Sequence, residues 1–176
     1  TKLTCFYDKK IQVAAKQRAH ETDFFEDEDI CVVACGRLHT IGAISDLHQG
    51  SVEFRGIGET VASAYKKWGA SLAQNLIGEF AFAVWDKNEQ LLLCARDRFG
   101  QIPLSYRATE EGFAFASDFI SVAMGFSTRP EPNDDWIIGY LNEAVLDQDS
   151  TPFKGVRKLP PGSLITWRNN ELELRQ

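Results

Sequence analysis

The sequence predicts an α+β fold in which antiparallel sheets are covered by layers of helices. Two pairs of apolar runs, each pair joined by a short polar turn, are typical of β-hairpins. Segments with apolar residues at helical spacing stand before and after these hairpins and do not alternate regularly with single strands. A doubly wound parallel sheet requires that alternation, so the pattern favours antiparallel sheets with helices packed on them.

The composition fits one globular domain. The chain has 176 residues, of which 44% are hydrophobic and 25% charged, enough apolar material for a core. Its 19 Lys and Arg against 25 Asp and Glu give a net charge of −6, which argues against nonspecific binding to nucleic acid or to anionic membranes. No apolar run approaches the ~20 residues of a spanning helix and no segment resembles a signal peptide, so we expect a cytoplasmic protein.

The N-terminal part carries three predicted strands and one acidic loop. Residues 3–7 and 51–54 are short apolar runs, and residues 30–35 are predicted to form a buried strand that Gly36 ends. Six of the nine residues from 21 to 29 are acidic, and their mutual repulsion favours a solvated loop.

Helix signals and hairpins follow. A helix is predicted from Glu59 until Gly69, because apolar residues recur there at helical spacing. Residues 80–85 and 91–95 form one predicted hairpin. Residues 104–108 and 113–116 form a second, in which Gly112 allows the tight turn.

Two further helices and two strands are predicted toward the C-terminus. Ser117 is the predicted cap of a short helix up to Met124, and Asn133 is the predicted cap of another. Residues 164–167 and 172–174 are predicted strands. The second helix has an apolar face made of Trp136, Ile137, Tyr140, Leu141 and Ala144.

The four cysteines show no metal-ligand spacing. Cys31 and Cys35 share one predicted strand, while Cys5 and Cys94 are isolated. Without a C-x-x-C pair, reduced and partly buried thiols are the expected state, and no metal site is expected.

Three ordered segments resemble the glutaminase domain of asparagine synthetases. They are residues 76–86, 95–104 and 113–117, and residues 154–162 resemble the segment that leads toward the synthetase domain. The resemblance covers about Gly36 to Gln176. It implies an N-terminal-nucleophile hydrolase fold of class II glutamine amidotransferases, an αββα sandwich of two antiparallel sheets between helical layers.

The resemblance also implies a domain organisation and a partner. Residues 1–155 are expected to form the amidotransferase-like domain, and residues 156–176 lead toward a synthetase domain that this chain does not contain. That domain, in cis or in trans, is the expected partner, with a peptide or small molecule as a further candidate ligand. ATP and Mg are expected only there, and no cofactor is expected in this chain, which has no Gly-rich phosphate loop.

The segment Arg96-Asp97-Arg98, with Gly100, is predicted to support the fold rather than catalysis. It ends an apolar strand, so its charges can pair across the turn. Gly100 allows a positive φ there.

The glutaminase chemistry of this family requires a nucleophile with a free α-amine. A cysteine thiolate attacks the glutamine amide, and the α-amine of the same cysteine is its base, so the cysteine must begin the mature chain. Here residue 1 is Thr, and Cys5 is a candidate only if residues 1–4 are removed. Cys5 is followed by Phe6-Tyr7 instead of the family's Gly-Ile pair.

The oxyanion site also departs from the family pattern. The family carries Asn-Gly-Glu where this chain has Cys35-Gly36-Arg37. A thiol is a weak donor, and the loss of one oxyanion donor costs about 10²-fold or more in rate.

The family's acid that binds the substrate α-amine is missing from the aligned segment Ile57-Gly58-Glu59. In register with Glu59 the acid becomes Ile57, which cannot pair with an ammonium. The Arg-Gly-Pro-Asp segment of the family is absent too.

These departures lead to three hypotheses. In the first, the chain is a degenerate glutaminase-fold domain, as in β-lactam synthetases and lasso-peptide cyclases, which form an internal amide and need no ammonia from glutamine. It then supports or positions the substrate of an ATP-dependent synthetase. In the second, it is an active glutamine amidohydrolase that supplies ammonia for asparagine synthesis, with Cys5 exposed by processing. In the third, it is a partner- or peptide-binding module whose old pocket Ile57 and Cys35 make more apolar.

Overall fold

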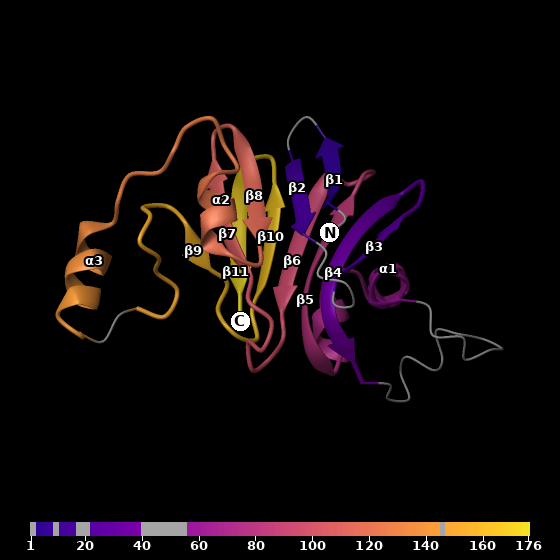
Figure 1. The fold of residues 1–176 in the computed structure, drawn as a ribbon. Helices are drawn as coiled ribbons and strands as arrows, with labels where there is room; N and C mark the ends of the chain where they lie inside the picture. Colours follow the sequence, from indigo (N-terminus) through magenta and orange to yellow (C-terminus); the bar gives the residue numbers. More distant parts are fainter. Residues whose placement is uncertain (1–2, 9–10, 17–21, 40–55, 145–146) are drawn as a thin grey trace.

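Two β-sheets form the centre of the computed structural model, which describes residues 3–8, 11–16, 22–39, 56–144 and 147–176 (Figure 1). One sheet has the order β1-β2-β8-β7-β9 and the other the order β11-β10-β6-β5-β4-β3. The described pairings are antiparallel, apart from the parallel pairing of β2 with β8. The strands are β1 Leu3–Asp8, β2 Ile11–Lys16, β3 Thr22–Glu26, β4 Ile30–Leu38, β5 Gly78–Asp86, β6 Leu91–Arg96, β7 Ser105–Thr109, β8 Gly112–Ala116, β9 Arg157–Lys158, β10 Leu164–Arg168 and β11 Glu171–Arg175.

Both predicted hairpins are confirmed. Strands β5 and β6 pair from Ala81 with Arg96 to Asp86 with Leu91, and β7 pairs with β8 around Gly112, whose φ is +140°. The Asp86 carboxylate accepts hydrogen bonds from the main-chain N–H groups of the first hairpin turn, which fixes the register of the two strands.

Apolar side chains of both sheets meet in the space between them. Phe113 of β8 stacks on Tyr106 of β7 at 5.9 Å and contacts Trp167 of β10 at 5.8 Å, measured between ring centroids. Trp85 of β5 and Trp167 are buried in the same cluster. Full burial of one large apolar side chain contributes about 1.5–3 kcal/mol, so this cluster is a main source of stability.

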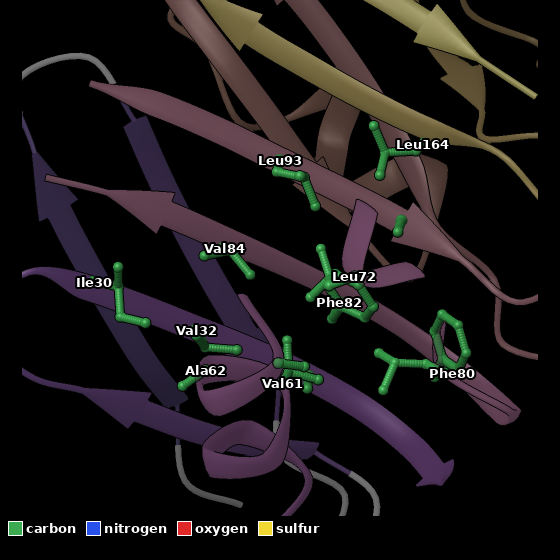
Figure 2. Close-up of a cluster of buried hydrophobic side chains, with 14 residues drawn as sticks. Ile30, Val32, Val61, Ala62, Leu72, Phe80, Phe82, Val84, Leu93 and Leu164 are labelled. Atoms are coloured by element: carbon green, nitrogen blue, oxygen red, sulfur yellow. The ribbon is translucent and has the colours of Figure 1, made fainter. Parts of the chain in front are cut away.

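Helices cover the outer faces of both sheets. Helix α1 (Ile57–Trp68) and the 3₁₀ helix η2 (Gly69–Asn75) pack on the six-stranded sheet, and Figure 2 shows the shared core with Val61, Leu72 and Phe82. Helix α2 (Phe119–Ala123) packs on the five-stranded sheet through Val122 and Ala123. The expected αββα sandwich is therefore confirmed. Gly69, with a φ of +55°, ends α1 as predicted.

Three local predictions, two about strands and one about the cap of α2, differ from the structure. The acidic segment 21–29 contains a strand, β3, because Phe24 and Phe25 pack on opposite sides of the six-stranded sheet. Strand β4 continues past Gly36 to Leu38. Helix α2 begins after Asp118, whose carboxylate accepts from the Ser121 N–H at 2.7 Å, and not after Ser117. The predicted strand 51–54 lies outside the described residues.

The fourth difference concerns helix α3 (Asp134–Leu141). Asn133 caps it as predicted, but its apolar residues do not face a core, and none of its residues is buried. Figure 1 shows α3 set apart from both sheets.

Residues 157–175 contribute three strands to the two sheets. Strand β9 pairs with β7, and β10 pairs with β6 on one side and β11 on the other. The domain boundary between residues 155 and 156 stays a prediction. None of the described helices is long and apolar enough to cross a membrane.

Candidate functional site

The buried carboxylate of Asp97 organises the turn after β6. Its Oδ1 atom accepts hydrogen bonds from the N–H groups of Phe99 at 3.0 Å and Gln101 at 3.1 Å, and Oδ2 accepts from Ile102 at 3.2 Å. Asp97 has no exposed surface. A buried carboxylate needs such partners, so the turn and the charge stabilise each other.

The main chain of Asp97 joins three further segments. Its N–H donates to the carbonyl of Phe80 in β5 at 2.8 Å, and its carbonyl accepts from Gly100 at 3.0 Å and from Gly162 at 2.8 Å. Phe80 in turn lies opposite Gly36 of β4. The turn therefore supports the strand end that carries the expected oxyanion residues.

Arg96 donates to three main-chain carbonyls around the same turn. Its Nε reaches Ile102 at 2.8 Å, Nη1 reaches Leu159 at 2.7 Å and Nη2 reaches Gly100 at 2.6 Å. Burial lowers the pKa of the Arg96 guanidinium, against the opposing effect of the neighbouring Asp97. The side chains of Arg96 and Asp97 thus hold the turn through hydrogen bonds to the main chain, whereas the sequence predicted pairing of charges across it.

Gly100 and Arg98 complete this motif. The φ of Gly100 is +64°, and a Cβ there would lie 2.8 Å from Cγ of Pro161 and 3.0 Å from Cζ of Arg96. Arg98 is exposed and, with Phe99, lines a cavity of about 310 Å³ between η2 and the C-terminal strands. The described bonds of Arg96 and Asp97 serve the fold.

The expected oxyanion segment forms the end of β4. Gly36 has a φ of +113°, and a Cβ there would lie 2.0 Å from the carbonyl oxygen of Glu79 in β5, so only glycine fits. Cys35 is half-buried and Arg37 is exposed. The close approach of β4 and β5 explains why glycine stands at this position without any catalytic role.

The second expected pocket segment forms the start of α1. Ile57 is half-buried and packs against the apolar cluster beneath the helix. Gly58 is buried, and its N–H donates to Oδ2 of Asp23 at 3.0 Å. Glu59 lies in the first helical turn, where an acidic side chain is favoured by the helix dipole.

Asp23 lies between the strand that carries Cys35 and the start of α1, and its role was not predicted from the sequence. It belongs to β3, where it lies opposite Ala34, the neighbour of Cys35. A Cβ on Gly56 would lie 1.9 Å from Asp23 Oδ2, so the carboxylate is seated against the start of α1. This role was not predicted because Asp23 belongs to an acidic run that was expected to form a solvated loop.

Burial disfavours the thiolate form of two of the described cysteines, Cys31 and Cys94. Burial raises the pKa of the Cys31 thiol to about 12, with a smaller contribution from Glu26, and burial also raises that of Cys94. Cys5 lies within β1, opposite Ala14 of β2, and its side chain is outside the described residues. The described residues hold no cluster of His, Cys, Asp and Glu that could bind a metal ion.

Comparison with known proteins finds matches over nearly the whole chain. A family model described as a glutamine amidotransferase domain matches residues 13–176, which begins before Gly36, where the resemblance was expected to start. Amidase chyE of Penicillium rubens is 34% identical over 151 residues, covering 84% of this chain and 22% of that protein. Asparagine synthetase [glutamine-hydrolyzing] 1 of Bacillus subtilis is 29% identical over 147 residues, covering 82% of this chain and 23% of that protein.

A solved structure has the same fold. Glutamine phosphoribosylpyrophosphate amidotransferase from B. subtilis superimposes with a TM-score of 0.51 at 16% identity, over 88% of this chain and 30% of that one. At this identity the likeness concerns the fold alone. The chain spans about a fifth of the length of the two relatives above.

Proposed function

The chain belongs to the glutamine amidotransferase domain family, and on this premise we propose that it is a domain of an asparagine-synthetase-like enzyme whose own glutaminase has been lost. Its remaining task is to support the synthetase domain or to position that domain's substrate. The observation that supports the proposal is the packing at the start of α1, where Ile57, predicted to stand at the position of the glutamine-binding acid, lies against an apolar cluster.

Ile57 and Asp23 together support the loss of glutamine binding. Ile57 packs into the apolar cluster and offers no charge to the α-ammonium group of glutamine. The Asp23 carboxylate is already engaged by the N–H groups of Gly58 and Phe24, both at 3.0 Å. Transfer of an ammonium group from water to an apolar surface without a partner is unfavourable, so glutamine gains nothing there.

The end of β4 supports the loss of transition-state stabilisation. With Cys35 in place of the family's Asn, the side-chain amide donor to the oxyanion is gone. Removal of one such donor costs about 10²–10³-fold in rate. Unless residues 1–4 are removed, the nitrogen of Cys5 is part of a peptide bond and cannot act as a base.

The proposal assigns the nucleotide chemistry to another domain. Asparagine synthetases among the relatives are several times longer than this chain. ATP and Mg would act in their additional length, where a carboxylate is activated for attack by an amine. The amine then comes from the substrate itself and not from glutamine.

A second candidate function is amide hydrolysis, favoured by the relative named Amidase chyE. In that case Cys5 is exposed by processing and attacks an amide carbonyl, as in the family pattern. It requires an α-amine on Cys5 and a way to bind glutamine that does not use Ile57.

Release of glutamate distinguishes the two functions. We expect that the natural polypeptide, incubated with glutamine at high enzyme concentration, releases no glutamate above a control without enzyme. Glutamate formation that is lost in the Cys5→Ala variant would instead establish the hydrolase. A glutamine-hydrolysing asparagine synthetase assayed in parallel shows that the assay detects turnover.

A further inference from the structure

Helix α3 exposes apolar side chains to solvent. Ile138 is 57% exposed, Tyr140 63% and Leu141 74%, and none of the residues of the helix is buried. A helix that carries apolar residues on several sides is ordinarily buried by a neighbouring element. Contiguous apolar patches on a protein surface are typical of interaction sites.

The helix is held firmly at its N-terminal end. Asn133 Oδ1 accepts from the Trp136 N–H at 3.4 Å, and Asn133 Nδ2 donates to the carbonyl of Thr151 at 3.0 Å. Pro132 and Phe153 form a β-bridge beside this cap. These contacts fix the direction in which α3 projects from the sheets (Figure 1).

The exposed ring of Tyr140 is ordered by a contact with the half-buried Trp136. The rings of Trp136 and Tyr140 stack with centroids 5.2 Å apart and an angle of 7° between their planes. Stacked aromatic rings provide a large and rigid contact area at a low cost in conformational entropy. They are therefore suited to bind a preformed surface.

Acidic groups border the apolar patch. Asp134, Asp135 and Glu143 are exposed at the two ends of the helix. A partner surface that covers α3 is therefore expected to be apolar at its centre and basic at its rim, because complementary charge favours the correct orientation.

We propose that α3 is the docking helix for the synthetase-homologous part of the same polypeptide. This inference rests on the proposed function and adds the surface through which the two parts meet. The relatives carry more than three quarters of their length outside the region that this chain matches, which supplies such a partner within one molecule. Three large apolar side chains of α3 are exposed, whereas α2 exposes Ile120 alone to a similar degree.

Thiol labelling of the natural polypeptide tests the interface. Leu141→Cys places a thiol in the patch, and Ile120→Cys is a matched control, since Ile120 is 58% exposed on another helix. Each variant is reacted with a maleimide, the modified peptide is quantified by mass spectrometry, and its rate is divided by the rate in denaturant. Tyr140→Cys is a second probe of the same patch.

We expect residue 141 to react about tenfold or more slowly than residue 120, because a covered thiol reacts only when the interface opens. Equal rates at both positions would overturn the proposal. Protection that disappears on dilution would also overturn it, because a second copy of the chain would then be the partner. If residue 141 is accessible and the polypeptide releases no glutamate, only the proposed interface is refuted. If the polypeptide releases glutamate from glutamine, the proposed function is refuted.

Discussion

The turn after β6 and the start of α1 differ in how closely their residues match the family pattern. In the turn, the residues of the family motif are present, and each charged group has several main-chain partners, as Asp97 and Arg96 show. At the start of α1, Ile57, which is predicted to replace the family's acid, packs into an apolar cluster. Under the proposed function, this difference means that the residues required for folding are not those required for glutamine chemistry.

The physical reason lies in burial. Loss of one partner in a buried network leaves other polar groups unsatisfied, so selection on folding alone preserves every member. A side chain that serves a substrate has no such obligation once the substrate is no longer used. Under the proposed function, the turn is therefore preserved because folding requires it, whereas the start of α1 has changed because glutamine is no longer bound there.

The largest effect is expected for Asp97→Ala. The substitution leaves the N–H groups of Phe99, Gln101 and Ile102 without their acceptor, so the free energy of unfolding should fall by about 3 kcal/mol or more. Urea unfolding measures this fall in the free energy of unfolding. The control Asp118→Ala removes only the exposed cap of α2 and should cost about 1 kcal/mol. A loss below that of the control would contradict the role of Asp97.

Gly100→Ala tests the turn by backbone geometry. The new Cβ would meet Pro161 and the Arg96 guanidinium in addition to the strain of a positive φ, so we expect a loss of about 2–3 kcal/mol. Gly155→Ala is the matched control, because its φ is +75° but nothing lies within 4 Å of a Cβ there, and about 1 kcal/mol is expected. Thermal or urea unfolding of both variants measures the loss of unfolding free energy. Equal losses in the two variants would show that the close approach of Pro161 and Arg96 to Gly100 does not contribute.

Ile57→Asp addresses the other region by restoring the family's acid. Because Ile57 packs on an apolar cluster, the variant should lose about 1–2 kcal/mol of stability and gain no glutamine binding in calorimetry. Ile77→Asp is the control, since Ile77 is 52% exposed and its change should be nearly neutral. Unchanged stability together with new glutamine binding would indicate that the pocket is still intact.

The smallest effect is expected from the exposed pair of Asp27 and Lys66, which lie 2.6 Å apart. Burial raises the pKa of Asp27, but hydrogen bonds from Lys66 and from the N–H groups of Ile30 and Asp29 outweigh it, and the net pKa is lowered. The lowered pKa means that Asp27 stabilises the fold above its unfolded pKa and that this contribution is lost as the pH falls through the folded value.

The contribution should be below about 1 kcal/mol, because the pair is exposed to solvent. It is measured as the fall in unfolding free energy between about pH 6 and about pH 3, which should be smaller in Asp27→Asn than in the unchanged protein. An identical pH dependence in the two proteins would show that Asp27 contributes nothing.

The sequence predicts the middle of the fold well. The hairpins and α1 have strong periodicity, and their turns and stops carry glycine or Asp86. Strand β3 could not be found in this way, because acidic residues surround the two phenylalanines that place it in the sheet. The cap of α2 was misplaced by one residue, since Ser117 and Asp118 are both good caps and only the local geometry selects between them.

The candidate site is less accessible to sequence reasoning. That Arg96 and Asp97 serve the fold was predicted, but their main-chain partners come from segments as distant as Leu159 and Gly162, which no local pattern reveals. Asp23 reaches Gly58 across 35 residues of sequence for the same reason. The exposure of α3 was not foreseen, because an apolar helix face predicts burial and does not say by what.

The central claim is that the fold has been kept while the glutamine site has been lost. Its most direct test is incubation of the natural polypeptide with an electrophilic glutamine analogue, followed by measurement of the intact mass and peptide mapping. If the glutamine site has been lost, Cys5 forms no adduct beyond slow labelling that glutamine does not prevent. A stoichiometric adduct on Cys5 that glutamine blocks would show a working glutamine site.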